Sequence, residues 1–432
     1  MPKCLNFPFI FMIKKTKSIQ EYESMSLAEL RKEAEEFKLE NYTELLKREL
    51  LLEVLKKKTE KDGYINVEGL LEVQKDGTHG VLRTSGVLEG ENDVYISGSQ
   101  IKKFGLKTGD LVTGPARLPK DKEKYLSLLR VDQVYGKPAS EAPKRPQFRK
   151  LTPVFPNRQI KLETTSDVLS TRIIDLLSPI GFGQRSMIVS PPKAGKTFLL
   201  KDIAAGIAKN HPKAKLMVVL VAERPEEVTD MRRFVKGEVF ASNFDELPEH
   251  NCKVAEMALS KAERMVEWGE DVVILMDSIT RLARAYNITM PTSGKTLSGG
   301  FDPAALYPPK RFFGAARNFE DGGSLTIIAT ALVDTGSRMD DLVYEEFKGT
   351  GNMELHLDRT LANRRIYPAI DVNASGTRNE ELLLGKEVLN QSWRIRRMLE
   401  LLNSNENPTE VLIGQLKKTK DNEEFLATLH EA

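Results

Sequence analysis

The stretch that decides the fold of this chain reads Ser190-Pro191-Pro192-Lys193-Ala194-Gly195-Lys196-Thr197. A short, apolar, β-prone run (187–189) precedes it, and a good helix former (198–205) follows it. A strand, a glycine loop and a helix N-terminus in this order form a phosphate cradle, because backbone N–H groups that the first helical turn leaves unpaired converge on the loop. We expect Lys196 to reach the outer phosphates of a nucleotide and the Thr197 hydroxyl to ligate Mg²⁺. Because glycine is usual where Ser190 stands, the stretch taken alone could also be a chance match in a surface loop.

Length and composition bound the rest of the chain. Its 432 residues are enough for two or three domains with substantial cores. The net charge of +2 is too small to imply nucleic-acid binding, so any basic surface must be local. Cys4 and Cys252 are the only cysteines, which excludes a disulfide framework and favours a reducing, cytoplasmic compartment. The apolar run 5–13 is far shorter than a membrane-spanning helix, so no membrane partner is expected.

The N-terminal part of the chain reads as helical. Residues 1–25 form an extension without an assigned role, and residues 26–60 form a small helical subdomain. Ser26 and Glu29 have the spacing of a capping box, which predicts a helix start there. A second helix is predicted over residues 42–58.

Residues 61–136 change to a period of two, which is typical of strands. Five short strands with glycine-rich turns suit a small closed barrel of the oligonucleotide-binding (OB) or cold-shock type. Such barrels stack bases on aromatic rings and pair phosphates with Arg or Lys. The candidates for the groove are Arg83, Tyr95, Lys124 and Tyr125, although the two tyrosines could also be ordinary strand residues.

A basic, proline-rich segment at residues 137–160 reads as a linker, and residues 161–432 alternate strands with helices. Continuous apolar runs at 216–221 and 272–276 are typical of buried parallel strands. The predicted fold class is therefore α/β, with a phosphate-loop motor domain behind the helical subdomain and the barrel. In open sheets of this kind, ligands bind at the carboxyl ends of the strands.

Two acidic residues follow predicted strands. Asp277 is positioned to hold Mg²⁺, usually through water, beside the phosphate loop. Glu223 is positioned to deprotonate an attacking water, and Arg224 to sense the terminal phosphate. The alternative for Glu223 is a surface salt bridge.

Taken together, several long motifs resemble the bacterial Rho family of transcription termination factors. They are residues 175–185, 191–197, 223–229, 277–286, 310–318 and 345–352, and the similarity covers residues 26–432 in the family's domain order. The resemblance implies a RecA-like motor and a ring-shaped homohexamer that uses ATP and Mg²⁺. It also implies that the ring binds single-stranded RNA, translocates along it, unwinds RNA–DNA hybrids and releases transcripts from RNA polymerase, in contact with elongation factors.

The resemblance also assigns the nucleotide site. It implies ATP contacts at Gly181, Phe182, Gly183, Gln184, Arg185, Ser186, Lys193, Ala194, Gly195, Lys196, Thr197, Phe198, Arg224 and Tyr367. It implies catalytic roles for Lys196, Glu223 and Asp277, and for Arg378 as an arginine finger given by the neighbouring subunit. Tyr367 stands where the family commonly has phenylalanine, and Ala222 stands where aspartate is usual.

Two RNA sites are implied as well. The primary site comprises Thr78, His79, Gly80, Val81, Leu82, Arg83, Asp93, Val94, Tyr95, Glu123, Lys124 and Tyr125, and the pore site comprises Lys295, Thr296, Leu297, Ser298, Gly299, Gly300 and Arg338. The family has aromatic residues at the positions of His79 and Val81. Because two stacking rings are missing, we expect the barrel to capture RNA more weakly and with less preference for cytosine.

Two other classes of protein suit parts of the sequence. A rotary or secretion ATPase subunit would share the motor motifs, but not a barrel of this type together with two pore loops. A non-enzymatic RNA-binding protein with a degenerate motor would be expected to have lost residues such as Lys196, Glu223 or Arg378.

Overall fold

The computed structural model describes residues 17, 19–39, 41–90, 92–120, 123–402 and 406–429. The chain divides into two compact units, residues 1–143 and 144–432. The apolar run 5–13 and Cys4 lie outside the described residues. Among the helices that are described, none has both the length and the apolar character needed to cross a membrane.

Three helices open the first unit: α1 (Ile19–Ser24), α2 (Leu27–Glu36) and α3 (Lys47–Asp62). The predicted capping box is confirmed: Ser26 Oγ accepts a hydrogen bond from the Glu29 N–H at 3.3 Å, and the Glu29 carboxylate accepts one from the Ser26 N–H at 2.7 Å. The predicted start of the second helix is wrong, because α3 begins at Lys47. The Glu49 carboxylate caps the Leu46 N–H at 3.1 Å and fixes that start.

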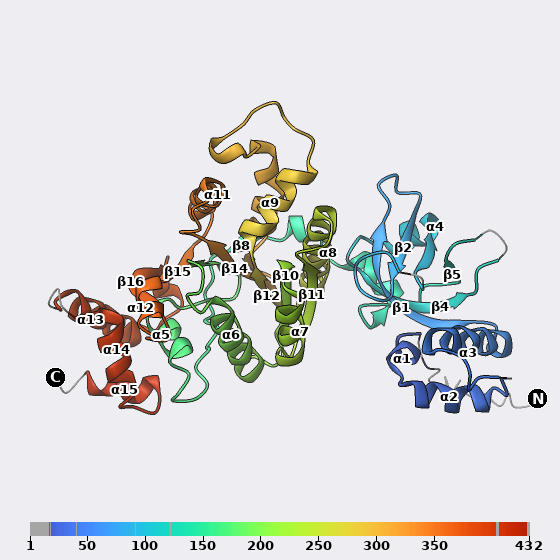
Figure 1. Cartoon of the computed structure of the whole chain (residues 1–432), viewed down its shortest axis with the longest axis horizontal. Coiled ribbons are helices and arrows are strands. Elements are labelled where there is room, and N and C mark those ends of the chain that lie inside the picture. Colours follow the sequence, from blue (N-terminus) through green and yellow to red (C-terminus); the bar gives the residue numbers. More distant parts are fainter. Residues whose placement is uncertain are drawn as a thin grey trace, which may run out of the picture. The chain divides into compact units, whose positions relative to one another are not determined.

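A closed barrel follows these helices (Figure 1). Its strands are β1 (Ile65–Val73), β2 (His79–Arg83), β3 (Val94–Ser97), β4 (Leu111–Arg117) and β5 (Leu126–Leu128). They pair in the order β1-β2-β3-β5-β4, and β4 returns to β1, which confirms the predicted five-stranded barrel. Helix α4 (Gly98–Phe104) ends at Gly105, whose φ of +58° is the left-handed geometry that favours glycine. Two short strands, β6 (Gln133–Val134) and β7 (Lys137–Pro138), extend the sheet from β4.

The second unit is built on a mostly parallel sheet, as predicted. In spatial order its main strands are β11 (Glu238–Asn243), β10 (Lys215–Glu223), β12 (Asp271–Asp277), β14 (Ser324–Leu332), β9 (Arg185–Ser190), β15 (Met353–Leu357) and β16 (Ile370–Thr377). The pairs from β11 to β15 are parallel, and β16 is antiparallel to β15. Two short strands extend the sheet: β13 (Arg317–Phe319) pairs with β14, and β8 (Pro153–Val154) pairs with β13.

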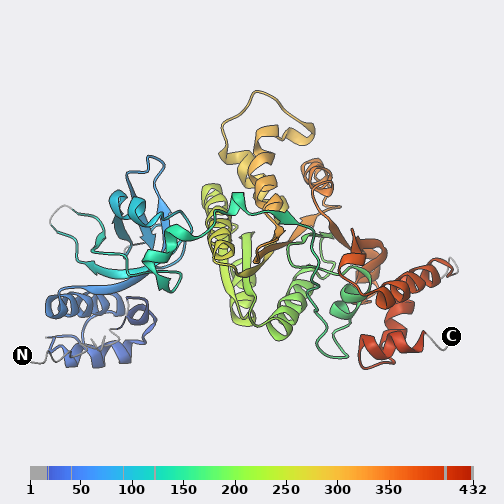
Figure 2. The same cartoon turned by 180° about the vertical axis from the view of Figure 1, so that it is seen from behind.

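Helices cover both faces of this sheet (Figure 2). The helices of this unit are α5 (Leu169–Leu177), α6 (Lys196–Asn210), α7 (Pro225–Phe234), α8 (Pro248–Glu267), α9 (Ile279–Thr289), α10 (Tyr307–Gly314), α11 (Arg338–Lys348), α12 (Arg359–Asn363), α13 (Lys386–Glu400), α14 (Pro408–Leu416) and α15 (Asn422–Thr428). One core joins α5, α6, α7 and the C-terminal helices α13 to α15 to side chains of alternate strand positions such as Val218 and Leu275. The buried side chains of α8, such as Val254 and Ala258, lie outside this core and pack on the strands from the other face.

The segment predicted as a linker, 137–160, is divided between the two units. It contains two short 3₁₀ helices, Ala139–Lys144 and Phe148–Lys150. In the second unit, the buried Arg145 side chain pairs with Glu267 of α8 at 3.1 Å, and the Phe148 N–H donates to the same carboxylate at 2.8 Å. These contacts fix the second half of the segment on α8.

Candidate functional site

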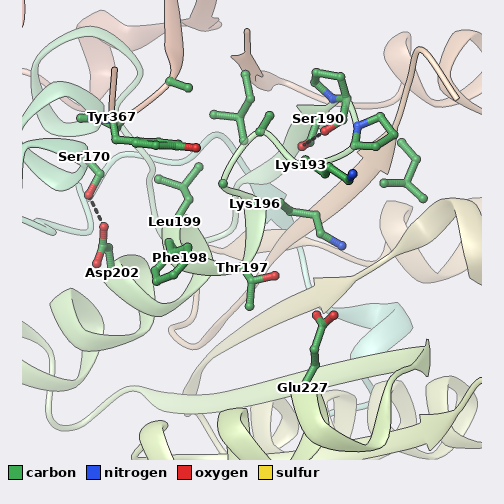
Figure 3. Close-up of a pocket in the computed structure, with 18 of the residues that line it drawn as sticks. Ser170, Ser190, Lys193, Lys196, Thr197, Phe198, Leu199, Asp202, Glu227 and Tyr367 are labelled. Carbon is green, nitrogen blue, oxygen red and sulfur yellow. Dashed lines mark hydrogen bonds between the residues drawn. The ribbon is translucent and has the colours of Figure 1, made fainter. Parts of the chain in front are cut away.

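The phosphate loop joins β9 to α6, as its sequence predicts. Gly195 precedes the first helical residue and has a φ of +94°. A Cβ atom at this position would lie 3.4 Å from the Tyr367 ring, so glycine lets the ring pack on the loop. The loop lines a cavity of about 1040 Å³ (Figure 3), together with the carboxyl ends of β10 and β14.

Lys196 of the loop contacts the carboxylate of Asp277, which ends β12. Asp277 is buried, and its Oδ1 also accepts a hydrogen bond from Thr330 Oγ1 at 2.9 Å. Both bonds fall on Oδ1, and no described residue donates to Oδ2. A carboxylate oxygen of Asp277, beside Lys196, and the hydroxyl of Thr197, which lines the cavity, suit a Mg²⁺ ion, which would neutralise phosphate charge when it is bound with a nucleotide.

Glu223 ends β10 and is only 3% exposed, so it is not a surface residue. Its carboxylate accepts a hydrogen bond from Arg281 Nη1 at 2.7 Å, and the same nitrogen contacts the Ala222 carbonyl oxygen. Burial, and next the negative charge of Asp277, raise the pKa of Glu223. A buried carboxylate with a raised pKa beside a phosphate loop can act as a general base.

The opposite end of the cavity carries two aromatic rings beside the hydrogen-bonded pair of Ser170 and Asp202. Figure 3 shows Tyr367 and Phe198 at this end, and Lys196, Thr197 and Glu227 toward the other. The Phe198 side chain is 76% exposed and Tyr367 is 46% exposed, so both rings are available to a flat ligand.

Several lining residues were not predicted from the sequence. The polar ones among them are Asp167, Ser170, Asp202, Glu227, Arg281 and Arg365. The Ser170 hydroxyl donates to Asp202 at 2.5 Å, and burial raises the pKa of Asp202. Among these residues, only Arg281 could have been found from the sequence, because it lies four positions after Asp277 on the helix that follows the strand.

Residues 181–186, which are expected to contact the nucleotide, do not line the cavity. They lead into the amino end of β9, whereas the phosphate loop follows its carboxyl end, and six extended residues span roughly 20 Å. Gln184 and Ser186 are buried, and Gln184 Nε2 donates to Asn352 Oδ1 at 2.9 Å. In the sequence, residues 181–186 lie close to the phosphate loop, but the extended strand β9 separates the two in space.

Arg185 instead lines a second hollow of about 250 Å³ with Arg378, which follows β16. The Arg378 N–H donates to the Asn352 carbonyl at 2.9 Å, which fixes it at the same end of the sheet. Burial lowers the pKa of Arg185, and the positive charges of Arg317 and Arg378 lower it further. Three guanidinium groups therefore lie near one another, at the end of the sheet opposite to this chain's own phosphate loop.

In the barrel, the predicted RNA residues share one region but differ in their availability. His79 stacks on Tyr95 with ring centroids 5.5 Å apart, whereas the Val81 side chain is buried. Arg83 contacts Asp93 and donates to Glu72 at 2.7 Å, so its guanidinium is engaged inside the protein. The remaining site residues of this region lie just before β2 (Thr78), on β2 (Gly80 and Leu82), on β3 (Val94) or just before β5 (Glu123, Lys124 and Tyr125).

The two predicted pore loops lie together in the second unit. Gly299, with a φ of +76°, approaches the start of α11 so closely that a Cβ atom there would lie 2.9 Å from the Met339 nitrogen. Arg338 is the first residue of that helix. Behind it, the buried Asp340 accepts hydrogen bonds from Arg284 at 2.6 and 2.8 Å, which ties the second loop to α9.

Family models match three parts of the chain. The nucleotide-binding domain of the ATP synthase alpha/beta family matches residues 170–377. The RNA-binding domain of the Rho termination factor matches residues 67–140, and its N-terminal domain matches residues 21–63. The last two matches fall on the barrel and on the helices before it.

Relatives of known name match nearly the whole chain. Transcription termination factor Rho of Bacillus subtilis (strain 168) is 54% identical over 417 residues, covering 96% of this chain and 97% of the relative. The Rho of Thermotoga maritima is 52% identical over 415 residues, with the same coverage.

Among solved structures, an ATPase from the type III secretion system of pathogenic bacteria superposes with a TM-score of 0.54 and 21% identity, covering 73% of this chain and 93% of that chain. This likeness shows a shared motor fold alone, so the secretion ATPase alternative rests on fold similarity only. With its N-terminal and RNA-binding domains matched and relatives above 50% identity over almost its full length, the chain belongs to the Rho family of transcription termination factors.

Proposed function

We propose that the chain forms a homohexameric ring that hydrolyses ATP with Mg²⁺ to translocate along single-stranded RNA, unwind RNA–DNA hybrids and release transcripts from RNA polymerase. Its place of action would be the cytoplasm, where elongation complexes and their factors are its partners. The proposal rests on family membership and on the geometry of the nucleotide cavity.

One observation supports the proposed ring. Arg378 and the phosphate loop lie at opposite ends of β9, so Arg378 is out of reach of this chain's own nucleotide. An arginine finger supplied by a neighbour is a common device for stabilising charge in phosphoryl transfer. The hollow of Arg185 and Arg378 would then meet the nucleotide of the adjacent subunit, and residues 181–186 would make their contact across that interface.

Within its own cavity, each residue has a defined task. Lys196 would hold the outer phosphates, and Thr197 and Asp277 would hold the ion. Arg281 would orient the Glu223 carboxylate, which would take a proton from the attacking water. Tyr367 and Phe198 would stack on the adenine base.

A mixing experiment tests the shared site. Arg378→Ala and Lys196→Ala are each expected to abolish RNA-dependent ATP hydrolysis. When the two variants are mixed, some interfaces combine an intact Lys196 with an intact Arg378, so part of the turnover should return. Mixed rings that assemble fully and stay inactive would contradict a site completed between subunits.

The role of RNA is tested separately on the unaltered protein. Hydrolysis is expected to depend on single-stranded RNA. Turnover that is indifferent to RNA would instead favour a rotary or secretion-type motor, and no turnover at all would indicate a simple binding protein.

A further inference from the structure

An acidic side chain lies among the residues predicted to contact RNA in the barrel. Glu89, on the loop between β2 and β3, contacts the Lys124 ammonium and accepts a hydrogen bond from the Tyr125 hydroxyl at 2.5 Å. Both partners belong to the segment that leads into β5, so the carboxylate bridges two loops of the barrel. The Lys124 ammonium also lies 5.1 Å from the centre of the Tyr125 ring.

A buried residue of the barrel fixes the position of the Glu89 loop. Asp93, which is fully buried, accepts a hydrogen bond from the N–H of Gly90 at 2.9 Å and also contacts Arg83. The residue next to Glu89 is therefore tied to the start of β3. Because parallel pairing joins β3 to β5, this tie brings the loop beside Tyr125.

The chemistry of this cluster resembles that of a bound phosphate. A phosphate oxygen of an RNA strand would accept hydrogen bonds from a lysine ammonium and a tyrosine hydroxyl, as the Glu89 carboxylate does here. We propose that Glu89 is an internal competitor for the RNA phosphate, so that RNA must displace its carboxylate from Lys124 and Tyr125 before the groove can close on the strand.

This inference rests on the proposed RNA role of the barrel and adds a residue that sets its affinity. Hydrogen bonds from Lys124 and then from Tyr125 lower the pKa of Glu89 to about 2, and the charge of Arg83 acts in the same direction. The carboxylate is therefore charged at neutral pH, and a substitution rather than a pH change is needed to remove the competitor. The pair is exposed, so its displacement is expected to alter affinity by a modest factor.

The test uses the full-length chain without nucleotide and a fluorescently labelled, cytidine-rich RNA of about a dozen nucleotides. Glu89→Gln keeps the side-chain shape and removes the charge, and it is expected to tighten binding about three- to tenfold. Lys124→Gln should weaken binding, and in the Lys124→Gln background the Glu89 substitution should change affinity less than about twofold. The matched control is Glu44→Gln, which removes one exposed negative charge from the turn before α3.

Two further measurements separate competition from a general charge effect. Because Lys124 is already neutralised by Glu89, the wild-type protein should show a shallower dependence of log Kd on log salt than Glu89→Gln, by about 0.7. Chemical acetylation of Lys124, read by mass spectrometry, should be faster in Glu89→Gln, and RNA should slow it in both proteins.

The outcomes are distinguishable. A gain in Glu89→Gln no larger than in Glu44→Gln, a gain that persists without Lys124, or acetylation of Lys124 that RNA does not slow would each overturn the role of Glu89 while leaving RNA binding intact. A wild-type chain that binds no RNA would overturn the proposed RNA function as well.

Discussion

Arg281 Nη1 donates a 2.7 Å hydrogen bond to the carboxylate of Glu223, and it comes from the helix that begins just after Asp277. The three residues belong to neighbouring parallel strands and the helix that follows one of them. The arrangement fixes a buried carboxylate beside the phosphate loop, with one cation to orient it.

Glu223→Gln is expected to retain nucleotide binding and to lower the rate of hydrolysis by at least about a hundredfold, because general base catalysis typically contributes that much or more. The amide keeps the size of the side chain but cannot take up a proton. Binding is measured with a fluorescent ATP analogue, and turnover by phosphate release in the presence of RNA. Glu227→Gln, in the same cavity, is the control and should retain most of the turnover. Normal turnover in Glu223→Gln would mean that another group is the base.

Arg281→Gln is expected to shift the pH profile of hydrolysis. The base must be deprotonated to act, so turnover rises with pH through the pKa of Glu223. The positive charge of Arg281 lowers that pKa against the effects of burial and Asp277. Without it the pKa should rise further, and the acid limb of kcat should move to higher pH, with partial return in Arg281→Lys. An acid limb that stays in place would show that the arginine does not control the protonation of Glu223.

The fold was predictable wherever local pattern and tertiary structure agree. Alternation gave the barrel strands, and continuous apolar runs gave β10 and β12, because parallel strands are buried on both faces. The start of α3 was misplaced because residues 42–46 are helix-compatible, and only the Glu49 cap decides where the helix begins. Strand β11 was not predicted, since it is short and less apolar.

The candidate site was predictable at strand ends and not beyond them. Lys196, Thr197 and Glu223 lie at or just after the carboxyl ends of strands and line one cavity, and Asp277, at the end of the strand beside β10, contacts Lys196. Asp202 lines the same cavity from within α6, where no sequence pattern marks it. The ion pairs of Arg83 with Asp93 and Glu72 could not be predicted either, because the register between neighbouring strands decides which side chains meet.

Asp175 is expected to make the stability of the second unit depend on pH. Burial raises the pKa of this carboxyl to about 7, even though it accepts hydrogen bonds from the Leu162 N–H at 2.9 Å and the Glu163 N–H at 2.8 Å. In the unfolded chain the pKa of an aspartate is about 3.9. Between these values the folded state holds more protons, so the free energy of unfolding should fall by about 1 kcal/mol per unit as the pH rises, and level off above pH 7.

Asp175→Asn removes this titration. Relative to the wild type, the variant should therefore gain about 1 kcal/mol of stability for each pH unit between about pH 4 and pH 7, as measured by chemical denaturation followed in the second unit. The control is Asp321→Asn, an exposed residue of the same unit, which should leave the slope unchanged. An Asp175→Asn protein with the wild-type slope would show that the carboxyl is already charged at low pH.

Gly299→Ala is expected to impair the coupling of hydrolysis to RNA more than Gly300→Ala does. The φ angles of Gly299 and Gly300 are +76° and +78°, so alanine at either position costs about 1–2 kcal/mol of backbone strain. Of the two, only Gly299 would bring the added Cβ against backbone, 2.9 Å from the Met339 nitrogen; at Gly300 no described residue other than its chain neighbours lies within 4 Å of that position. The alanine at 299 must therefore push the first loop away from the start of α11 and from Arg338. RNA-stimulated turnover should fall severalfold in Gly299→Ala while ATP binding stays normal, and Gly300→Ala should lie close to the wild type. Equal loss in the two variants would mean that loop flexibility, rather than the contact between the two loops, is what the RNA response requires.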